Sequence, residues 1–435
     1  MRSKLSLLLF CLAAIFYLGV GTYKASHFSV DFIPVYSGAR CFVAGCNSYD
    51  PAQLQEQYLG AHGNPRLLDA DFWASRPPVY PPSTLVMLAP LAWLPFHAAS
   101  IVWALAGGGL LVIAIVMVLW MCPRKYFWVG AFLAAVFLLA DSPSLLGTGN
   151  PATFACALTV MGAVLFLRDR YIPLAVVLLT IALTVKPQVA GLVVLYFLVR
   201  RIHWRGAVVV LSASLAILLL GSAMLQARPA SRNWLPMLKA QIQEAVQPGH
   251  TDDPSPANVT YGDLVNLQTL TSMVVPGRAA YNVAAWVIWL GMFAGWIYAM
   301  GKMGAGGGNH LLVLPPLLVL SLLPVYHRGC DDLILLLAIP MAVMVLGRRR
   351  ALGYALVAVM ALPHLMDVVM PRLLNLARSR WGMPYIVQHK LLFLALMRYQ
   401  SPVLLVLFGL LLAGMLVGDW SSMESHPVGR KPLNA

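Results

Sequence analysis

The chain has 435 residues, of which 60% are hydrophobic and only 11% are charged. Because a soluble globular domain carries about 25% charged residues, this composition excludes a protein whose surface faces only water. The net charge of +14 does not indicate nucleic-acid binding, since the Lys and Arg residues stand in short clusters between hydrophobic blocks. Backbone polar groups find no partners in lipid, so these blocks predict an all-α polytopic membrane protein.

The first apolar run covers residues 5–20 and follows Arg2 and Lys4. No small-residue cleavage site comes after it, so we predict a retained helix rather than a signal peptide. Residues 83–96 are apolar but short and broken by two prolines, which favours a re-entrant or interfacial segment. The remaining predicted helices bring the total to about twelve spans: 98–121, 126–141, 151–167, 172–185, 187–200, 206–225, 281–300, 310–324, 331–347, 351–366 and 401–418.

The basic residues predict the orientation of this single membrane domain, which covers residues 1–418. Placing both termini in the cytoplasm puts the short basic loops on the cytoplasmic side of the plasma membrane. These loops hold Arg124/Lys125, Arg168/Arg170, Arg200/Arg201/Arg205, Lys302 and Arg348–Arg350. The outer loops are then residues 23–97, 226–280 and 367–400, and residues 419–435 form a cytoplasmic tail.

Residues 172–200 are either one long helix or two short ones. A single helix would bury Lys186 in mid-membrane, at a cost on the order of 3 kcal/mol, and Pro187 would remove a helix hydrogen bond. We therefore predict two short helices with Lys186 at their outer tip. Helices of about 14 residues cannot cross upright, so the membrane thins locally or protein surrounds the pair.

The predicted outer side carries most of the residues that are equipped for chemistry. Asp31 follows the first helix and is either a general base or an ordinary hydrated carboxylate at a helix end. Lys186 suits a phosphate near the headgroups, or it snorkels to the membrane surface. Four ionisable residues interrupt a late apolar stretch, where charge is more often functional than a solvated turn: His327, Arg328, Asp331 and Asp332.

Further candidates for substrate binding on this side are polar or aromatic. Asn150, Asn266 and Gln268 are suited to sugar hydroxyls, and capping or helix packing is equally compatible with them. Tyr36 and Tyr80 complete the set. Cys41 and Cys46 share one loop and are either a disulfide or two free thiols, and none of the six cysteines has metal-ligand spacing.

Several strings in succession resemble glycosyltransferase family 87 over roughly residues 25–345. They are DFIPVYSGARCFVAGCNSYDP, VYPPSTLVMLAPLAWLP, GTGNPATFACAL and LTVKPQVAGLVVLYFLVRRIHWRG, followed by VNLQTLTSMV and YHRGCDDLILLLAIP. That family has the GT-C membrane fold and includes mannosyltransferases that use polyprenol-phosphate-mannose. Because each string is short, their order along the chain carries the resemblance.

The resemblance implies transfer of a hexose, mannose in the first place, from a polyprenyl-phosphate donor to a lipid or glycan acceptor outside the cytoplasm, with inversion at the anomeric carbon. Asp31 would be the general base, Lys186 and Arg328 would neutralise the departing phosphate, and Asp332 would position a substrate. Two departures stand out. Asn150 replaces an expected Gln, and Asp331 precedes Asp332 where a Tyr-Asp pair is usual, which leaves open which Asp acts.

Two other classes of function fit the composition. A secondary transporter would place charges and broken helices near the midplane, usually in two related halves, and no repeat is evident here. An inactive membrane scaffold would predict that Asp31 is dispensable. Membrane lipids are expected partners and nucleic acid is not; no cofactor is indicated, and a divalent cation stays open because paired outer carboxylates could bind one.

Overall fold

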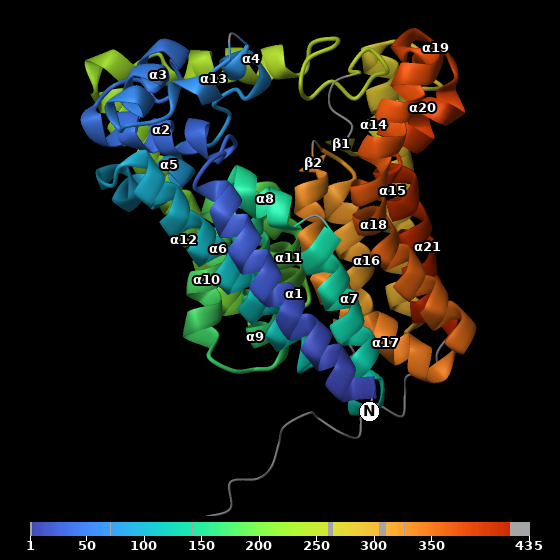
Figure 1. The fold of residues 1–435 in the computed structure, drawn as a ribbon. Helices are drawn as coiled ribbons and strands as arrows, with labels where there is room; N and C mark the ends of the chain where they lie inside the picture. The colour runs from blue at the N-terminus through green and yellow to red at the C-terminus, as the bar shows by residue number, and fades with distance from the viewer. Residues whose placement is uncertain are drawn as a thin grey trace, which may run out of the picture.

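The computed structural model describes residues 2–69, 71–140, 142–259, 264–303, 310–325 and 327–417, and it is built almost wholly from helices (Figure 1). The predicted tail at 419–435 lies outside the described residues. Within the described part, eight segments are long and apolar enough to span a membrane, which confirms the polytopic all-α prediction. They are Lys4–Ala25, Phe96–Leu119, Arg124–Thr148, Trp204–Ala227, Arg278–Lys302, Gly329–Arg348, Arg350–Trp381 and Gln400–Val417.

Four more predicted spans are helices that are apolar but shorter than the roughly 20 residues of a full crossing. These are α9 (Pro151–Leu167), α10 (Ile172–Val185), α11 (Pro187–Val199) and α16 (His310–Leu322). The total of about twelve spans therefore stays a prediction. The segment predicted to be interfacial forms α5 (Pro82–Leu88) and η2 (Ala89–Trp93), two short pieces that fit that expectation.

The long segments consist of the following elements: α1 (Arg2–Ala25), α6 (Phe96–Leu119), η3 (Arg124–Tyr126), α7 (Phe127–Ala140), α8 (Ser142–Thr148), α12 (Trp204–Ala227), α15 (Arg278–Lys302), η5 (Gly329–Ala338), α17 (Ile339–Arg348), α18 (Arg350–Trp381) and α21 (Gln400–Val417). Helix α18 continues well past its predicted end at residue 366. Its last turns pack against two later helices, since Ala377 shares a buried cluster with Ile386 and Phe393. Part of the predicted third outer loop is therefore helical.

Helices α10 and α11 form a hairpin. The chain leaves helical geometry at Lys186, where φ is −146° and ψ is 81°. At the other end of the pair, His203 Nε2 lies 3.3 Å from Asp169 Oδ1. The two ends of the segment therefore lie side by side, which confirms the two-helix interpretation and excludes a single long span.

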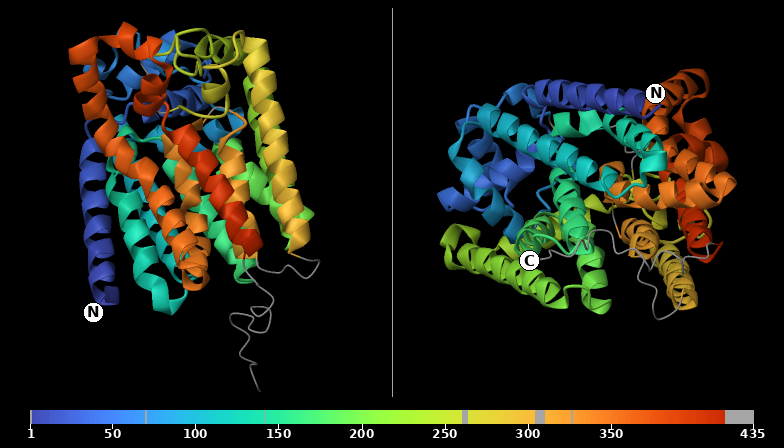
Figure 2. Two further views of the ribbon diagram at one scale, coloured as in Figure 1. Left: turned by 90° about the vertical axis from the view of Figure 1, so that its right-hand side faces the viewer. Right: turned by 90° about the horizontal axis from the view of Figure 1, so that it is seen from below.

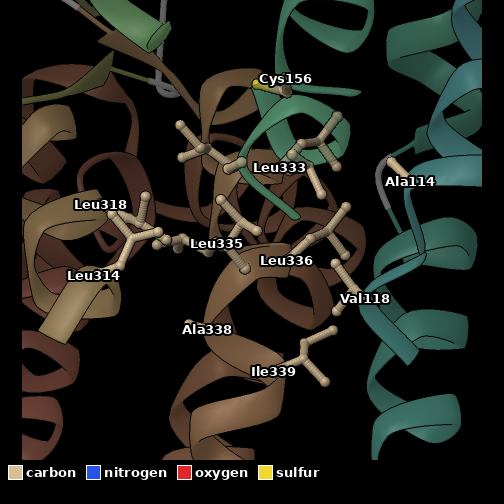
Figure 3. Packing of buried hydrophobic residues seen from close by; sticks show 14 of the residues in the cluster. Ala114, Val118, Cys156, Leu314, Leu318, Leu333, Leu335, Leu336, Ala338 and Ile339 are labelled. Carbon is tan, nitrogen blue, oxygen red and sulfur yellow. The ribbon is translucent and has the colours of Figure 1, made fainter. Parts of the chain in front are cut away.

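The centre of the bundle is the continuous segment η5–α17. Every residue from Gly329 to Leu346 is buried, in agreement with an apolar sequence that carries no polar face beyond its first turn. Figure 3 shows this segment between side chains of α16, such as Leu314, and side chains of α6, such as Val118. The bundle thus holds the first turn of η5, with its two aspartates, in a fixed place.

Short elements form a layer at one end of the bundle, which we call the capping layer. It contains α2 (Phe32–Ala44), α3 (Pro51–Gly60), η1 (Pro65–Leu67), α4 (Phe72–Ser75), η4 (Pro229–Ser231), α13 (Trp234–Ala245), β1 (Leu264–Val265), α14 (Gln268–Thr271), β2 (His327–Arg328), α19 (Met383–Gln388) and α20 (Lys390–Met397). The strands pair antiparallel, with Leu264 opposite Arg328. The N-terminus lies at the opposite end (Figures 1 and 2).

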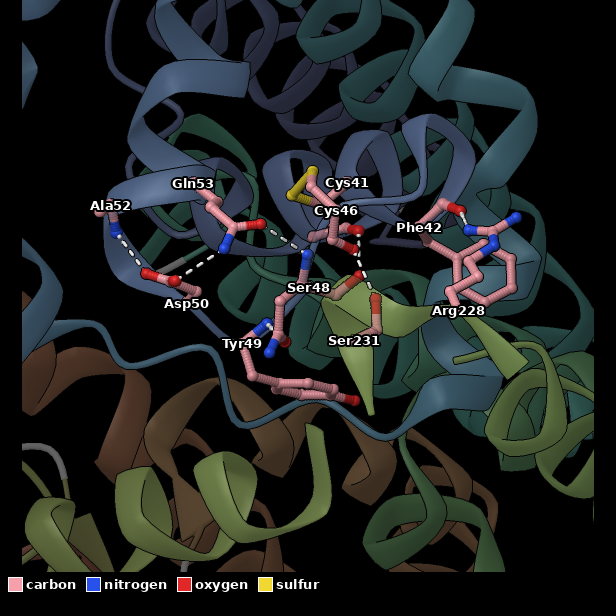
Figure 4. The surroundings of a disulfide bond; sticks show 12 residues. Cys41, Phe42, Cys46, Ser48, Tyr49, Asp50, Ala52, Gln53, Arg228 and Ser231 are labelled. Atoms are coloured by element: carbon pink, nitrogen blue, oxygen red, sulfur yellow. Dashed lines mark hydrogen bonds between the residues drawn. A yellow bond between two sulfur atoms is a disulfide. The ribbon is translucent and has the colours of Figure 1, made fainter. Parts of the chain in front are cut away.

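Cys41 and Cys46 form a disulfide at the end of α2, which decides between the two alternatives left open by the sequence. Figure 4 shows the bond beside the α12–α13 connection, where the Ser231 hydroxyl donates to the Cys46 carbonyl at 2.9 Å. Arg228 also donates to the Phe42 carbonyl. Both contacts join the end of α2 to the connection between α12 and α13.

Candidate active site

Asp31 lies on the link between α1 and α2, and that link is fixed to the connection between α8 and α9. The backbone N–H of Asp31 donates to the Thr148 carbonyl at 2.9 Å. Although Asp31 is the residue before α2, its side chain makes no capping hydrogen bond to that helix. The carboxylate is instead directed to two other groups: Asn150 Nδ2 is 3.2 Å from one oxygen, and Arg76 Nε is 3.5 Å from the other. The Asp31 carboxylate is thus contacted by two side chains and is not a carboxylate surrounded only by water.

Asn150 has the capping role that the sequence left open, and it also contacts Asp31. Its side-chain oxygen accepts from the Ala152 N–H at 3.0 Å and caps α9, while its amide nitrogen donates to Asp31. The preceding Gly149 has φ +74°, and a Cβ there would lie 2.7 Å from the Phe32 Cβ. The Gly-Asn pair therefore fixes Asp31 and helix α9 relative to one another.

Replacing Gly149 with Ala is expected to lower the free energy of unfolding by roughly 1–3 kcal/mol, since a side chain is strained in the left-handed region and would press on Phe32. Thermal unfolding in detergent would measure this loss. The matched control is Gly109→Ala in α6, which has no atom within 4 Å of its added Cβ and should be neutral or slightly stabilising. Equal effects of the two substitutions would contradict the prediction.

Lys186 lies at the tip of the α10–α11 hairpin and forms an ion pair with Asp331 Oδ1. Its side chain is only 12% exposed, so this lysine does not snorkel into water. Helix α5 fixes the tip, because the hydroxyls of Ser83 and Thr84 both donate to the Thr184 carbonyl, at 2.9 and 3.1 Å. The cation is thus held by the hairpin on one side and by η5 on the other.

His327 completes a buried group around Asp331. Its Nδ1 lies 2.8 Å from Asp331 Oδ2, and the His327 side chain is fully buried. Among the residues that the structure describes, no hydrogen-bond partner reaches its Nε2. The Asp331 carboxylate thus lies between an ammonium and an imidazole.

The adjacent aspartates point to different surroundings. Asp332 Oδ2 lies 3.9 Å from Nε2 of His364, a buried histidine on α18. The His364 ring packs against Phe137 with centroids 3.9 Å apart. The resemblance assigned a role to Asp332, but the structure brings Asp331 rather than Asp332 to Lys186.

The charges of Asp31 and of the Lys186–Asp331 pair both affect the pKa of Tyr80. Burial raises the pKa of its hydroxyl, Lys186 opposes this rise, and Asp31 and Asp331 add to it. Its backbone carbonyl accepts from the Tyr49 hydroxyl at 2.8 Å, which fixes the Pro-rich segment that carries it. Tyr80 therefore lies within electrostatic reach of both Asp31 and the Lys186–Asp331 pair.

Arg328 faces the second outer loop. It donates to the Thr251 hydroxyl at 2.7 Å and lies 3.6 Å from Asp252 Oδ1. It also supplies its backbone N–H to Asp331 Oδ2 at 3.4 Å. Arg328 thereby holds this loop beside β2, and its backbone contacts the Asp331 carboxylate.

The other predicted substrate-binding residues take part in loop structure. The Tyr36 hydroxyl donates to the Leu94 carbonyl at 2.5 Å, and its ring is buried among aromatic neighbours. Asn266 accepts from the Thr269 N–H at 2.9 Å, and Gln268 donates to the Pro324 carbonyl at 3.0 Å. These contacts match the capping and packing alternative.

Arg76 is the site residue that the sequence analysis missed. It ends α4 in the string SRPPVYPP, four residues before Tyr80, and the sequence gives no periodicity that would single it out. The one feature of the sequence that could have indicated Arg76 is its position in the Pro-rich first loop, beside the YPP string. No group of three or more His, Cys, Asp or Glu side chains in the described ranges could hold a metal ion.

Comparison with models of protein families identifies the family of this chain. The model of glycosyltransferase family 87 matches residues 79–299. The chain belongs to glycosyltransferase family 87. This family 87 protein is thus a membrane glycosyltransferase rather than a transporter, and the earlier resemblance, including the consistent GT-C assignment, is confirmed. The matched stretch contains Tyr80, Asn150 and Lys186, whereas Asp31 and Asp331 flank it and are brought to it by the fold. No curated protein and no solved structure matches the chain significantly.

Proposed function

We propose that this glycosyltransferase transfers a hexose, mannose in the first place, from a polyprenyl-phosphate donor to a lipid- or glycan-linked acceptor. The reaction would take place in the capping layer, on the outer face of the cytoplasmic membrane, with both termini in the cytoplasm. The observation that carries the proposal is that helix α9 contacts both groups. Asn150 before its first turn donates to the Asp31 carboxylate, and six residues later the Cys156 thiol donates to the carbonyl of Asp331, the partner of Lys186. Displacement at an anomeric carbon needs a base on one side and stabilisation of the leaving group on the other.

Asp31 would act on the acceptor. Its carboxylate takes the proton of an acceptor hydroxyl while that oxygen forms a bond to the anomeric carbon of the donor sugar. The bond between this carbon and the phosphate oxygen breaks, and polyprenyl phosphate leaves with the electron pair. Because the two oxygens lie on opposite sides of the carbon, the product has the inverted configuration.

The group around Lys186 would receive the phosphate. The donor is a phosphodiester with one negative charge, and the released phosphate gains a further charge, which Lys186 can offset. Asp331 orients the His327 ring through Nδ1. The Nε2 atom, which has no partner among the described residues, would then face a phosphate oxygen.

The test is a comparison of donors with the purified protein in lipid nanodiscs. Radiolabelled polyprenyl-phosphate mannose, polyprenyl-phosphate glucose and a nucleotide-linked mannose are each incubated with a membrane lipid and glycan extract. Label is expected in a product only from the polyprenyl-phosphate donors, and NMR of that product should show an inverted anomeric centre. Transfer from the nucleotide sugar alone, or retention of configuration, would contradict the proposal.

A further inference from the structure

Arg76 lies beside the base without forming a hydrogen bond to it. Its Nε is 3.5 Å from Asp31 Oδ1, and the two side chains are 32% and 29% exposed. The Nε atom itself is buried, and no hydrogen-bond partner for it exists among the described residues. The guanidinium is held by its own segment, stacked over the Phe72 ring at 5.4 Å and donating to the Ser75 hydroxyl at 3.1 Å. Arg76 is thus aimed at the base by contacts that do not involve Asp31.

The proposed reaction changes the charge next to Arg76. When Asp31 takes a proton from the acceptor, its carboxylate becomes neutral, and the guanidinium loses the negative charge beside it. A cation in a partly desolvated site needs a counter-charge, and water supplies this poorly there. Transfer is therefore favoured if another anion is close to Arg76 when the proton moves.

The donor phosphate is badly placed to be that anion. In a displacement the leaving oxygen lies across the anomeric carbon from the attacking oxygen, so the phosphate belongs with Lys186 and His327. Arg76 shares the side of Asp31, where the acceptor hydroxyl must lie. The anion that approaches Arg76 is consequently part of the acceptor.

We infer that Arg76 binds an acidic group of the acceptor, a carboxylate or a phosphate next to the reacting hydroxyl; this rests on the proposed function. Both groups match the planar guanidinium, which forms paired, charge-assisted hydrogen bonds to either. Arg76 would exchange Asp31 for the acceptor's anion, so that the carboxylate is free to take the proton when a suitable acceptor is bound. Arg76 therefore selects the acceptor.

The experiment compares wild-type protein with Arg76→Gln, Arg76→Lys and the control Arg66→Gln, which removes the same charge from an exposed residue of the same loop. Each is given radiolabelled polyprenyl-phosphate mannose and a cell-envelope extract separated into anionic and neutral fractions. Wild type should label the anionic fraction. Arg76→Gln should lower kcat/KM for that fraction roughly 10- to 100-fold, mainly through KM, with partial rescue in Arg76→Lys and unchanged binding of the donor.

Chemical treatment of the anionic fraction identifies the group. Cleavage of phosphate esters with hydrofluoric acid should abolish labelling if the anion is a phosphate, and carbodiimide amidation should abolish it if the anion is a carboxylate. Labelling of the neutral fraction by wild type, or equal activity of Arg76→Gln and Arg66→Gln, would overturn the inference and leave the proposed function standing. A wild type that labels neither fraction would overturn both.

Discussion

Replacing Asp31 with Asn is expected to lower kcat roughly 10²- to 10⁴-fold, because the amide keeps the shape of the side chain but cannot take the acceptor's proton. Single-turnover transfer of label from the polyprenyl-phosphate donor would measure the loss, and equilibrium binding of the same donor should be unchanged. A large decrease in turnover with intact donor binding would identify Asp31 as the base.

The matched control for this substitution is Asp50→Asn. Asp50 lies in the same capping layer and caps α3, where its side chain accepts from the Ala52 N–H at 3.0 Å. Asn is as good a cap as Asp, so this variant should keep both stability and turnover. Full turnover in Asp31→Asn, or an equal loss in Asp50→Asn, would refute the assignment of the base.

Breaking the ion pair between Lys186 and Asp331 should have the largest effect on stability. Lys186→Met is expected to cost about 3–5 kcal/mol of unfolding free energy, because it leaves a buried carboxylate without its cation. The double variant Lys186→Met with Asp331→Asn should recover much of this stability. Neither variant should bind the donor, since the cation that would meet the phosphate is gone.

Thermal unfolding and donor binding, measured on both variants, would separate the two effects. The control is Asp169→Asn at the other end of the hairpin, whose carboxylate pairs with His203 but is 77% exposed. An exposed pair contributes less than about 1 kcal/mol, so this variant should unfold near wild type. Donor binding that survives in the double variant would show that Lys186 stabilises the fold and does not hold the phosphate.

The helices of the bundle were predictable from the sequence because the signals for a membrane helix lie within the helix and its flanking residues. Runs of apolar residues and the position of basic clusters are read directly along the chain, and each candidate span appears in the structure as a helix. The α10–α11 hairpin followed from one Lys-Pro pair, since burying that charge in a single span would be costly. The extension of α18 was missed because its last turns are helical through packing against later helices, which a local pattern does not contain.

Side-chain contacts at the site were predictable only in part. Asp31 and Lys186 were singled out by their place at helix ends, whereas Arg76 reaches Asp31 through the fold of an irregular loop. Asp331 and Asp332 could not be told apart because their directions depend on the local backbone. In the 3₁₀ geometry of η5 successive side chains point about 120° apart, which sends one to Lys186 and the other to His364.

The shortness of α10 and α11 has a consequence for how the donor reaches the protein. A helix of 14 residues is about 21 Å long, against about 30 Å for the hydrocarbon layer. In the proposed orientation, with the inner ends of the hairpin at the inner boundary, the ammonium of Lys186 would lie well below the level of the outer headgroups. A phosphate attached to a long isoprenoid chain would reach that depth while its chain stays in the hydrocarbon core. A water-soluble sugar nucleotide would have to leave water to reach the same depth. The length of two helices would thus filter donors before any side chain touches them.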